Sequence, residues 1–172
     1  MTDTRRTATR PPETTRQFIE RHEGFRLKAY KDTRGLWTWG YGCRINDPLI
    51  IATLNAGHPW TLTNAQANAL FTAAIARAID DATYFFKAFP KFSPARRTAL
   101  VSLSFHLGGS GLAHFPELCK AVRRRDWSRA ADELRFKDGL TKDSPSLYAL
   151  GFPERCRETA RLLEGGLTRP SA

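Results

Sequence analysis

The sequence predicts a mainly helical α+β fold in which a small antiparallel hairpin near the N-terminus precedes a run of helices. Alternating apolar spacing is concentrated in residues 25–42, which is typical of a hairpin. Most of the later chain shows the three-and-four spacing of amphipathic helices. With 172 residues and 41% hydrophobic content, the chain is long enough for one domain with a substantial core. We expect that domain at residues 14–166, with a disordered basic tail at 1–13 and a short tail at 167–172.

The first predicted element is a helix that begins at residue 14 or 15 and ends at Glu23. Phe18 and Ile19 fall on one helical face, and Gly24 stands where a left-handed C-terminal cap is expected. The carboxylate of Glu23 is therefore predicted to lie at a helix end.

A hairpin is predicted to follow this helix. The polar cluster at residues 32–35 marks its bend, which places Asp32 in the turn and Thr38 on the second strand. Gly40 and Gly42 within that strand indicate a bulge or a close approach of a ligand or of another part of the backbone.

The remainder is predicted to be helical after a loop that contains Pro48, Gly57 and Pro59. Thr63 and Gln66 have the spacing of a capping box, so a long helix is expected to start there. Further helices are expected at residues 93–107, 116–125, 126–136 and 153–163.

Charge and cysteine content narrow the partners and exclude some classes of protein. The formal charge of +10 favours a polyanionic partner, which leaves nucleic acid, anionic lipid and an anionic cell wall open. Cys43, Cys119 and Cys156 are odd in number and widely spaced, so free thiols are expected rather than disulfides or a metal site. No apolar run reaches eighteen residues, and we expect neither a signal peptide nor a stable membrane anchor.

Glu23 and Asp32 are the candidate chemical pair. Cleavage of a glycosidic bond needs one carboxylic acid to protonate the leaving oxygen and a second carboxylate to activate water or attack the sugar. The chain reverses between these two residues, and such a reversal is able to place both carboxyls across a cleft. The spacing alone does not distinguish such a pair from ordinary surface carboxylates.

The run EGFRLKAYKDTRGLWTWGYG at residues 23–42 resembles the signature of the phage T4-type lysozyme family of glycoside hydrolases. Weaker similarity extends from about residue 15 to residue 164. The resemblance implies a lysozyme-like fold with a small hairpin-bearing N-terminal lobe, a helical C-terminal lobe and a cleft between them.

The resemblance also implies roles for individual residues. Glu23 corresponds to the general acid, Asp32 to the second carboxylate, and Thr38 to a hydroxyl that positions the attacking water. Such a route inverts the anomeric carbon and needs the carboxyls to lie about 6.5 to 9.5 Å apart. Arg155 matches an arginine that pairs with the acid. Because an arginine lowers the pKa of a neighbouring carboxyl, burial must oppose it if Glu23 is to be protonated.

Substrate contacts are expected from Phe105, His106 and Arg155. His106 stands where relatives have an amide that faces the cleft, and both substrate contact and helix packing remain open for it. Trp37 and Trp39 suit either stacking on sugar rings or packing in the core, and core packing is favoured.

The sequence departs from the family at Cys43. Relatives commonly have a histidine here, which pairs with an acid on the following helix, where this chain has Ala74. A small packing residue is favoured over a reactive thiol.

The implied function is that of an endolysin. A muramidase of this kind hydrolyses the β-1,4 bond between N-acetylmuramic acid and N-acetylglucosamine in peptidoglycan, as a monomer and without metal or organic cofactor. No nucleic acid partner is expected, whereas the basic face suits an anionic outer-membrane surface. Such an enzyme waits in the host cytoplasm until a holin opens the inner membrane, and then reaches the periplasm and cell wall.

Three other functions compete with this one. A lytic transglycosylase shares the architecture but uses one glutamate, and Asp32 and Thr38 in register argue against it. A basic module that binds cell wall or nucleic acid leaves the 23–42 run unexplained and lacks a recognised nucleic-acid motif. A lysozyme fold without activity is disfavoured by the presence of Glu23, Asp32 and Thr38 together.

Overall fold

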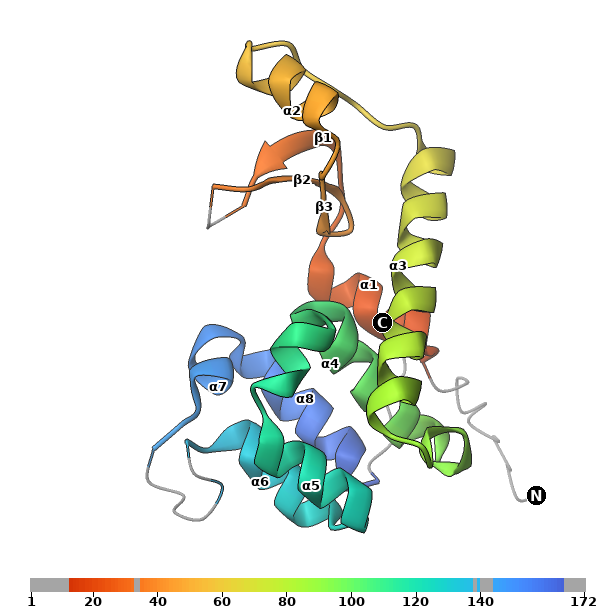
Figure 1. Ribbon diagram of the computed structural model, residues 1–172, viewed down its shortest axis with the longest axis vertical. Coiled ribbons are helices and arrows are strands. Elements are labelled where there is room, and N and C mark those ends of the chain that lie inside the picture. Colours follow the sequence, from red (N-terminus) through yellow and green to blue (C-terminus); the bar gives the residue numbers. More distant parts are fainter. Residues whose placement is uncertain (1–12, 33–34, 138, 140–143, 166–172) are drawn as a thin grey trace, which may run out of the picture.

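The computed structural model describes residues 13–32, 35–137, 139 and 144–165. It is mainly helical with a three-stranded antiparallel sheet, which confirms the predicted fold class. In Figure 1, the sheet and α2 form the upper part, the helices α4 to α8 form the lower body, and the long helix α3 connects the two. Almost all of the two predicted tails lies outside the described residues.

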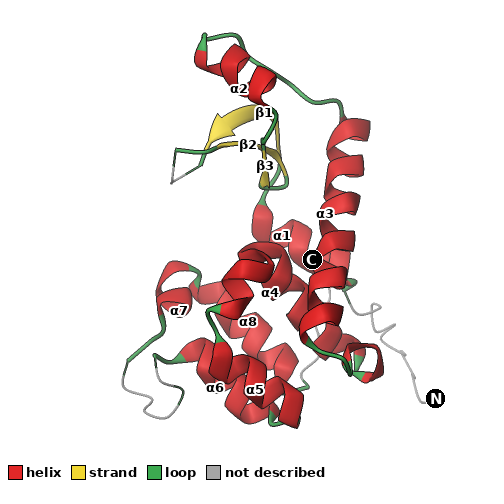
Figure 2. Ribbon diagram, viewed as in Figure 1, coloured by secondary structure: helices red, strands yellow, loops and turns green. Residues whose placement is uncertain are grey.

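Helices account for most of the chain, as the colouring in Figure 2 shows. The elements in order are α1 (Thr15–Glu23), β1 (Arg26–Lys31), β2 (Trp37–Gly40), β3 (Cys43–Arg44), α2 (Pro48–Asn55), α3 (Asn64–Phe85), the short 3-10 helix η1 (Phe89–Lys91), α4 (Pro94–Ala113), α5 (Pro116–Arg124), α6 (Trp127–Arg135), α7 (Leu147–Gly151) and α8 (Pro153–Leu163). In the described ranges, no helix combines the length and apolar character needed to cross a membrane.

Helix α1 ends at Glu23, as predicted. Thr14 accepts a hydrogen bond from the backbone of Gln17, whose side chain bonds back to Thr14, so the helix starts with a capping box. Gly24 ends it with a φ of 68°. Phe18 is buried in the core of the lower body, so α1 belongs to the helical part of the molecule rather than to the sheet.

The predicted hairpin is confirmed, and a third short strand extends it. Strand β2 pairs with β1 on one side and with β3 on the other, and Thr38 lies opposite Tyr30 and Arg44. The register is irregular between Arg26 and Tyr30 of β1. β3 has only two residues, which is too short for the alternation of apolar residues to reveal it.

The predicted loop through Pro48 is wrong, because α2 occupies residues 48–55. Asp47 caps this helix by accepting hydrogen bonds from the backbone of Leu49 and Ile50. Pro48 is its first residue, a position where the fixed φ of proline suits a helix and its missing N–H is not needed. The proline therefore starts a helix instead of marking a loop.

Helices α3 and α4 begin as predicted. Thr63 and Gln66 form the capping box of α3, and Ser93 caps α4. The predicted end of α4 at residue 107 is only partly right. Gly108 has φ 68° and ψ 170°, which breaks the helix, but a further helical stretch continues to residue 113.

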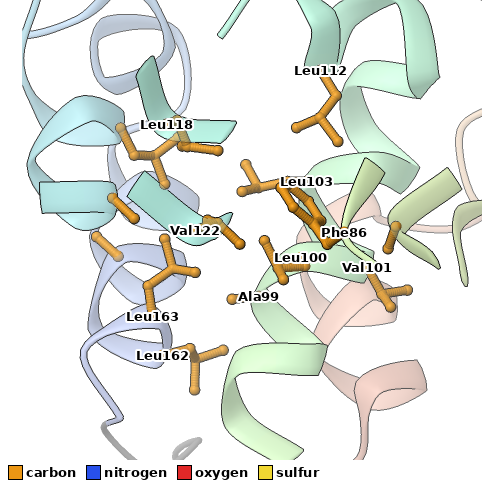
Figure 3. Close-up of a cluster of buried hydrophobic side chains, with 14 of the residues drawn as sticks. Phe86, Ala99, Leu100, Val101, Leu103, Leu112, Leu118, Val122, Leu162 and Leu163 are labelled. Atoms are coloured by element: carbon orange, nitrogen blue, oxygen red, sulfur yellow. The ribbon is translucent and has the colours of Figure 1, made fainter. Parts of the chain in front are cut away.

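The buried apolar side chains form two clusters. The larger fills the helical body, and Figure 3 shows Leu100, Leu103 and Val122 pointing toward one another within it. The smaller lies under the sheet and α2, and it contains Trp39, as the favoured core assignment predicted. Its buried members are Ala29, Trp39, Ile45, Leu54, Leu62 and Ala67.

Three aromatic rings connect the sheet region to the helical body. Tyr41, which follows β2, stacks on Phe71 of α3 with ring centroids 4.2 Å apart. Phe71 in turn meets the ring of Phe105 of α4 edge-on at 5.6 Å. Phe71 is fully buried, so these contacts hold β2, α3 and α4 in fixed relation.

Replacement of Leu100 by alanine is expected to destabilise the protein by about 2 to 5 kcal/mol, because a fully buried leucine leaves a cavity in a packed helical core. Urea unfolding followed by circular dichroism measures this. The matched control is Leu147→Ala on α7, where the leucine is 88% exposed and the expected change is within about 0.5 kcal/mol. Equal effects at the two positions would contradict the assignment of the core.

Candidate active site

The carboxylate of Glu23 lies where α1, α4 and α8 meet. Its Oε1 is 2.8 Å from Nη1 of Arg155 and 3.8 Å from Nδ1 of His106. The glutamate side chain is 14% exposed and the arginine side chain 5% exposed. This is a largely buried ion pair with a histidine beside it, and its members come from three helices that are distant in the sequence.

Burial and charge act in opposite directions on Glu23. Burial raises its pKa, but His106 and then Arg155 lower it, and the net result is a pKa below the ordinary glutamate value. Burial does oppose Arg155, as expected from the sequence, but the combined effect of His106 and Arg155 is larger and leaves the pKa of Glu23 lowered. Glu23 is ionised at neutral pH in the free protein.

Gly42 closes the site from the sheet side. Its φ is 72°, and a Cβ placed on it would lie 3.0 Å from Oε2 of Glu23. The close approach predicted from the glycines of the hairpin is thus made by Gly42 to the carboxylate itself. Only a glycine combines this backbone conformation with this contact.

Asp32 follows β1 and is fixed by the hairpin turn. Its Oδ1 accepts a hydrogen bond from the backbone N–H of Leu36 at 2.9 Å, and its backbone N–H donates to the carbonyl of Leu36 at the same distance. The side chain is half-buried. Residues 33 and 34, which complete the predicted bend, lie outside the described residues.

Thr38 is buried in the middle of the sheet, and both it and Asp32 hydrogen-bond to the backbone of Leu36. Its Oγ1 donates to the carbonyl of Leu36 at 3.1 Å, while the N–H of Leu36 binds Asp32. Because the hydroxyl hydrogen is used in this way, its oxygen is left to act as an acceptor.

Tyr30 of β1 has a shifted pKa to which both candidate carboxylates contribute. Burial raises the pKa of Tyr30; Arg26 lowers it, and the negative charges of Glu23 and Asp32 each raise it. One phenol therefore lies within electrostatic range of both carboxylates. Sequence reasoning missed Tyr30. Its position between Glu23 and Asp32 in the sequence is the signal that points to a place near the site.

A cavity of about 600 Å³ has Gly42, the neighbour of Glu23, in its wall, but neither Glu23 nor Asp32 lines it. It is lined by the end of the hairpin, by α3 and by α4, and Gly42 belongs both to its wall and to the surroundings of Glu23. Phe105 lines it as well. The volume lies in the usual range of small-molecule sites, about 300 to 1,000 Å³.

Cys43 and Ala74 face this same cavity. Cys43 is half-buried against the smaller core, and burial raises the pKa of its thiol, with a small opposing effect of Arg77. A raised pKa keeps the thiol protonated and poorly nucleophilic, which supports the packing interpretation. All three cysteines are free thiols, as expected.

His106 has an aromatic environment. The ring of Phe152 lies edge-on to it with centroids 4.2 Å apart, and that of Tyr148 at 5.8 Å. Tyr148 is buried, whereas Phe152 is partly exposed. Phe152 therefore presents an apolar ring next to the Glu23 site, and sequence analysis missed it because nothing in the sequence indicates that α7 ends beside α4.

A second ion pair, between the buried Glu158 and the partly exposed Arg21, supports the end of α1. Glu158 of α8 accepts from Nη2 of Arg21 at 2.8 Å and from Nε2 of His22 at 3.0 Å. Burial raises the pKa of Glu158 but Arg21 and His22 lower it overall, while burial, Arg155 and Arg21 lower the pKa of His22. His22 therefore donates as a neutral ring. This contact joins residues 136 positions apart.

The structure groups the predicted site residues in two sets. Glu23, His106 and Arg155 are in direct contact, and the side chains of Asp32 and Thr38 both bind the backbone of Leu36. Phe105 belongs to neither set, because it lines the cavity and packs on Phe71. The catalytic and substrate-binding roles of these residues stay predictions.

Substitution of Gly42 by alanine is expected to cost about 2 to 4 kcal/mol of unfolding free energy, since it adds a left-handed alanine and pushes on Glu23. Gly57→Ala is the matched control, with φ 87° and nothing within 4 Å of the added methyl group. We expect about 1 kcal/mol for this control, from backbone strain alone. Unfolding in urea compares the two, and a control as costly as Gly42→Ala would refute the contact.

Comparison with known proteins agrees with this arrangement. The family model of phage lysozymes matches residues 20–149. The chain is 29% identical over 130 residues to the pre-baseplate central spike protein of Enterobacteria phage T4, which covers 66% of this chain but 23% of that protein. It is 24% identical over 137 residues to probable T4-type lysozyme 2 of Dictyostelium discoideum and 22% identical to probable T4-type lysozyme 1, with 70% of this chain and 81% of each relative covered.

The matched region contains Glu23, Asp32, Thr38 and His106, whereas Arg155 lies beyond its end at residue 149. The chain spans less than a quarter of the spike protein but most of the two amoebal proteins. Membership implies glycoside hydrolase activity on peptidoglycan as the general class. Since the model covers most of the sequence, the chain belongs to the phage lysozyme family.

Proposed function

We propose that this protein is a muramidase that hydrolyses the β-1,4 bond between N-acetylmuramic acid and N-acetylglucosamine in bacterial peptidoglycan. The observation that carries the proposal is the largely buried carboxylate of Glu23, packed against Gly42, whose backbone also forms part of the wall of a cavity of about 600 Å³. Tyr30 lies within electrostatic range of both Glu23 and Asp32. Glycoside hydrolysis requires two carboxyl groups, one as acid and one as second carboxylate, and Glu23 and Asp32 are the candidates.

Glu23 is the proposed general acid and Asp32 the second carboxylate. In this mechanism Glu23 gives its proton to the leaving glycosidic oxygen, and a water held by Asp32 and Thr38 attacks the anomeric carbon from the other side. Thr38 suits this role because its oxygen is an acceptor in a buried position beside the Asp32 turn. The proposed outcome is inversion.

Glu23 has to become protonated in the complex with substrate. In the free protein, His106 and Arg155 keep the pKa of this carboxyl low. A glycan strand in the cavity excludes water, and the loss of solvation favours the neutral acid. Arg155 is too buried for a primary role in binding sugar, and we propose that it orients Glu23 instead. Phe105, with Phe152 beside His106, is the proposed apolar contact for sugar rings.

The proposed biological role is that of a monomeric endolysin. It would remain in the host cytoplasm until a holin permeabilises the inner membrane and would then cut the cell wall from the periplasm. The net charge of +10 supports attraction to anionic wall and outer-membrane surfaces, which salt should weaken. The match to a phage spike protein favours a second role for the same chemistry, that of a wall-cutting module of the virus particle.

Lysis of chloroform-permeabilised Gram-negative cells tests the activity. Glu23→Gln and Asp32→Asn are each expected to lose about a hundredfold or more of the rate, because each removes a group that acts on the reacting atoms. Glu154→Gln is the matched control, since this glutamate is on α8 near Arg155 but its side chain is 62% exposed. Mass spectrometry of the released muropeptides should show reducing-end N-acetylmuramic acid. Anhydro-muramic products, or full activity of Glu23→Gln, would overturn the proposal.

The pH profile is expected to reflect the low pKa of Glu23. A general acid works in its protonated form, so kcat/KM should rise as the pH falls from 8 to about 5, by roughly tenfold per pH unit where Glu23 alone limits the rate. Ionised Asp32 is needed as well, and activity should fall again in stronger acid. The rate of turbidity loss of purified peptidoglycan, measured at low substrate, gives this profile. A maximum of kcat/KM above pH 7 would contradict it.

A further inference from the structure

Arg16 of α1 connects its own helix to α3 through several contacts of one guanidinium group. Its Nη1 donates to Oγ1 of Thr72 at 3.1 Å, and its Nη2 donates to Oδ1 of Asn68 at 3.0 Å. Its Nε donates to Oε1 of Glu20, one turn further along α1, at 2.9 Å. The guanidinium carbon lies 4.7 Å from the centre of the Phe71 ring. One arginine therefore binds α1 and α3 at the same time, in a fixed orientation.

These contacts lie where α3 passes from the smaller core to the larger one. Ala67 is buried in the cluster under the sheet, whereas Phe71 is buried in the cluster of the helical body. Asn68 and Thr72 each follow one of these two residues in the sequence. Arg16 thus binds α3 at the junction between the part that contacts the sheet and the part that packs along α4 (Figure 1).

The start of α1 and α3 are partly separated by a cavity beside this junction. The cavity has a volume of about 380 Å³, and Thr15 lines it from α1 while Ile75 and Ile79 line it from α3. Helix α1 packs on α4 instead, where the hydroxyls of Thr15 and Thr98 lie 2.6 Å apart. The polar contacts of Arg16 therefore join two helices where apolar packing between them is incomplete.

The two helices that Arg16 joins carry different halves of the site. Helix α1 ends at Glu23, whereas α3 contacts β2 and β3 of the sheet to which the Asp32 turn belongs. Phe71 of α3 also stacks on Tyr41, the residue before Gly42. Gly42 in turn packs against the Glu23 carboxylate. A shift of α3 relative to α1 would therefore change the separation between the two candidate carboxyls.

We propose that Arg16 is a positioning residue that sets the separation between the carboxyls of Glu23 and Asp32. It acts through α3 and the ring of Phe71 rather than on the substrate. An inverting glycosidase needs its carboxyls about 6.5 to 9.5 Å apart, with room for one water. A misplacement of about 1 Å can cost up to about a hundredfold in rate. The inference rests on the proposed function, in which these two carboxyls are the catalytic pair.

The link can be removed from either of its ends. Arg16→Met keeps an aliphatic side chain over Phe71 and loses every donor. The double substitution Asn68→Ala with Thr72→Val removes the acceptors on α3 and leaves Arg16 paired with Glu20. Arg16→Lys keeps the positive charge, but its single ammonium group lacks the fork that serves three acceptors at once.

The matched control is Arg157→Met on α8. The side chain of Arg157 is 67% exposed, and its ion pair with Glu154, at 3.5 Å, stays within one helix. Thermal unfolding checks that each variant is folded. If Arg16→Met fails to fold, the double variant of α3 tests the same link with Arg16 in place.

The first readout is a distance and needs no activity. Spin-labelled p-acetylphenylalanine is introduced at Leu49 on α2 and at Leu147 on α7, whose side chains are 80% and 88% exposed. Pulsed electron paramagnetic resonance then measures the distance between the sheet region and the helical body. Arg16→Met and the double variant of α3 should each broaden the distance distribution. Arg16→Lys should broaden it less, and Arg157→Met should leave it unchanged.

The second readout separates kcat from KM on sonicated peptidoglycan. Arg16→Met should lower kcat about fivefold and change KM by less than about twofold, because the sugar contacts remain while the carboxyls lose their fixed separation. Arg16→Lys should recover part of the loss. Arg16→Met combined with the double variant of α3 should lose no more than either does alone, because all of them break the same link. A contact that only stabilises the fold would lower the melting temperature and leave kcat of the folded protein unchanged.

The two readouts fail separately. A distance distribution in Arg16→Met that superimposes on the wild type, an unchanged kcat, or losses of kcat that multiply in the combined variant would each overturn the role of Arg16, even if the protein cleaves peptidoglycan. Broadened distances in a protein that releases no muropeptides would support the link between α1 and α3 and overturn the muramidase proposal instead.

Discussion

The ion pair between Glu23 and Arg155 is the constraint around which the rest of the molecule is organised. A buried charge is costly unless a partner compensates it, and removal of one member leaves the other stranded at a cost of about 3 to 5 kcal/mol. The pair therefore fixes the end of α1 against the first turn of α8. Glu158, one turn further along α8, repeats this arrangement with Arg21 and His22. Two ion pairs, of which the one between Glu23 and Arg155 is the more deeply buried, thus hold α1 on the helical body.

The position of α1 explains how residues that are far apart in the sequence come together at the site. Because Phe18 and Ile19 are packed in the larger core, the helix that carries Glu23 is part of the same packed body as α4 and α8. Asp32 and Thr38 instead belong to the sheet above the smaller core. Gly42 bridges the two sets, since its backbone is packed against the glutamate and its neighbours line the cavity. The same glycine therefore contributes both to the surroundings of the Glu23 carboxylate and to the wall of the cavity.

Local sequence signals predicted the parts of the site that local structure creates. The end of α1 at Glu23, the hairpin with Asp32 and Thr38, and the capped start of α3 all follow from turn, cap and periodicity rules, and all are present. The helix at Pro48 does not follow from these rules, because proline is typical both of loops and of the first residue of a helix. The contact of Glu158 with α1 could not be predicted from the sequence. It joins residues 136 positions apart and depends on how two helices pack, which no local pattern reveals.

The division of the site between a large and a small core has a consequence for heat inactivation. The smaller cluster has six buried members, so it has far less apolar contact to lose than the cluster of the helical body. Segments with few buried contacts open at lower free energy than the whole molecule does. A local opening of the sheet would carry Asp32 and Thr38 away while Glu23 stayed in its ion pair. Inactivation and global melting would then be separate events, with the hairpin rather than the helical body as the weak point.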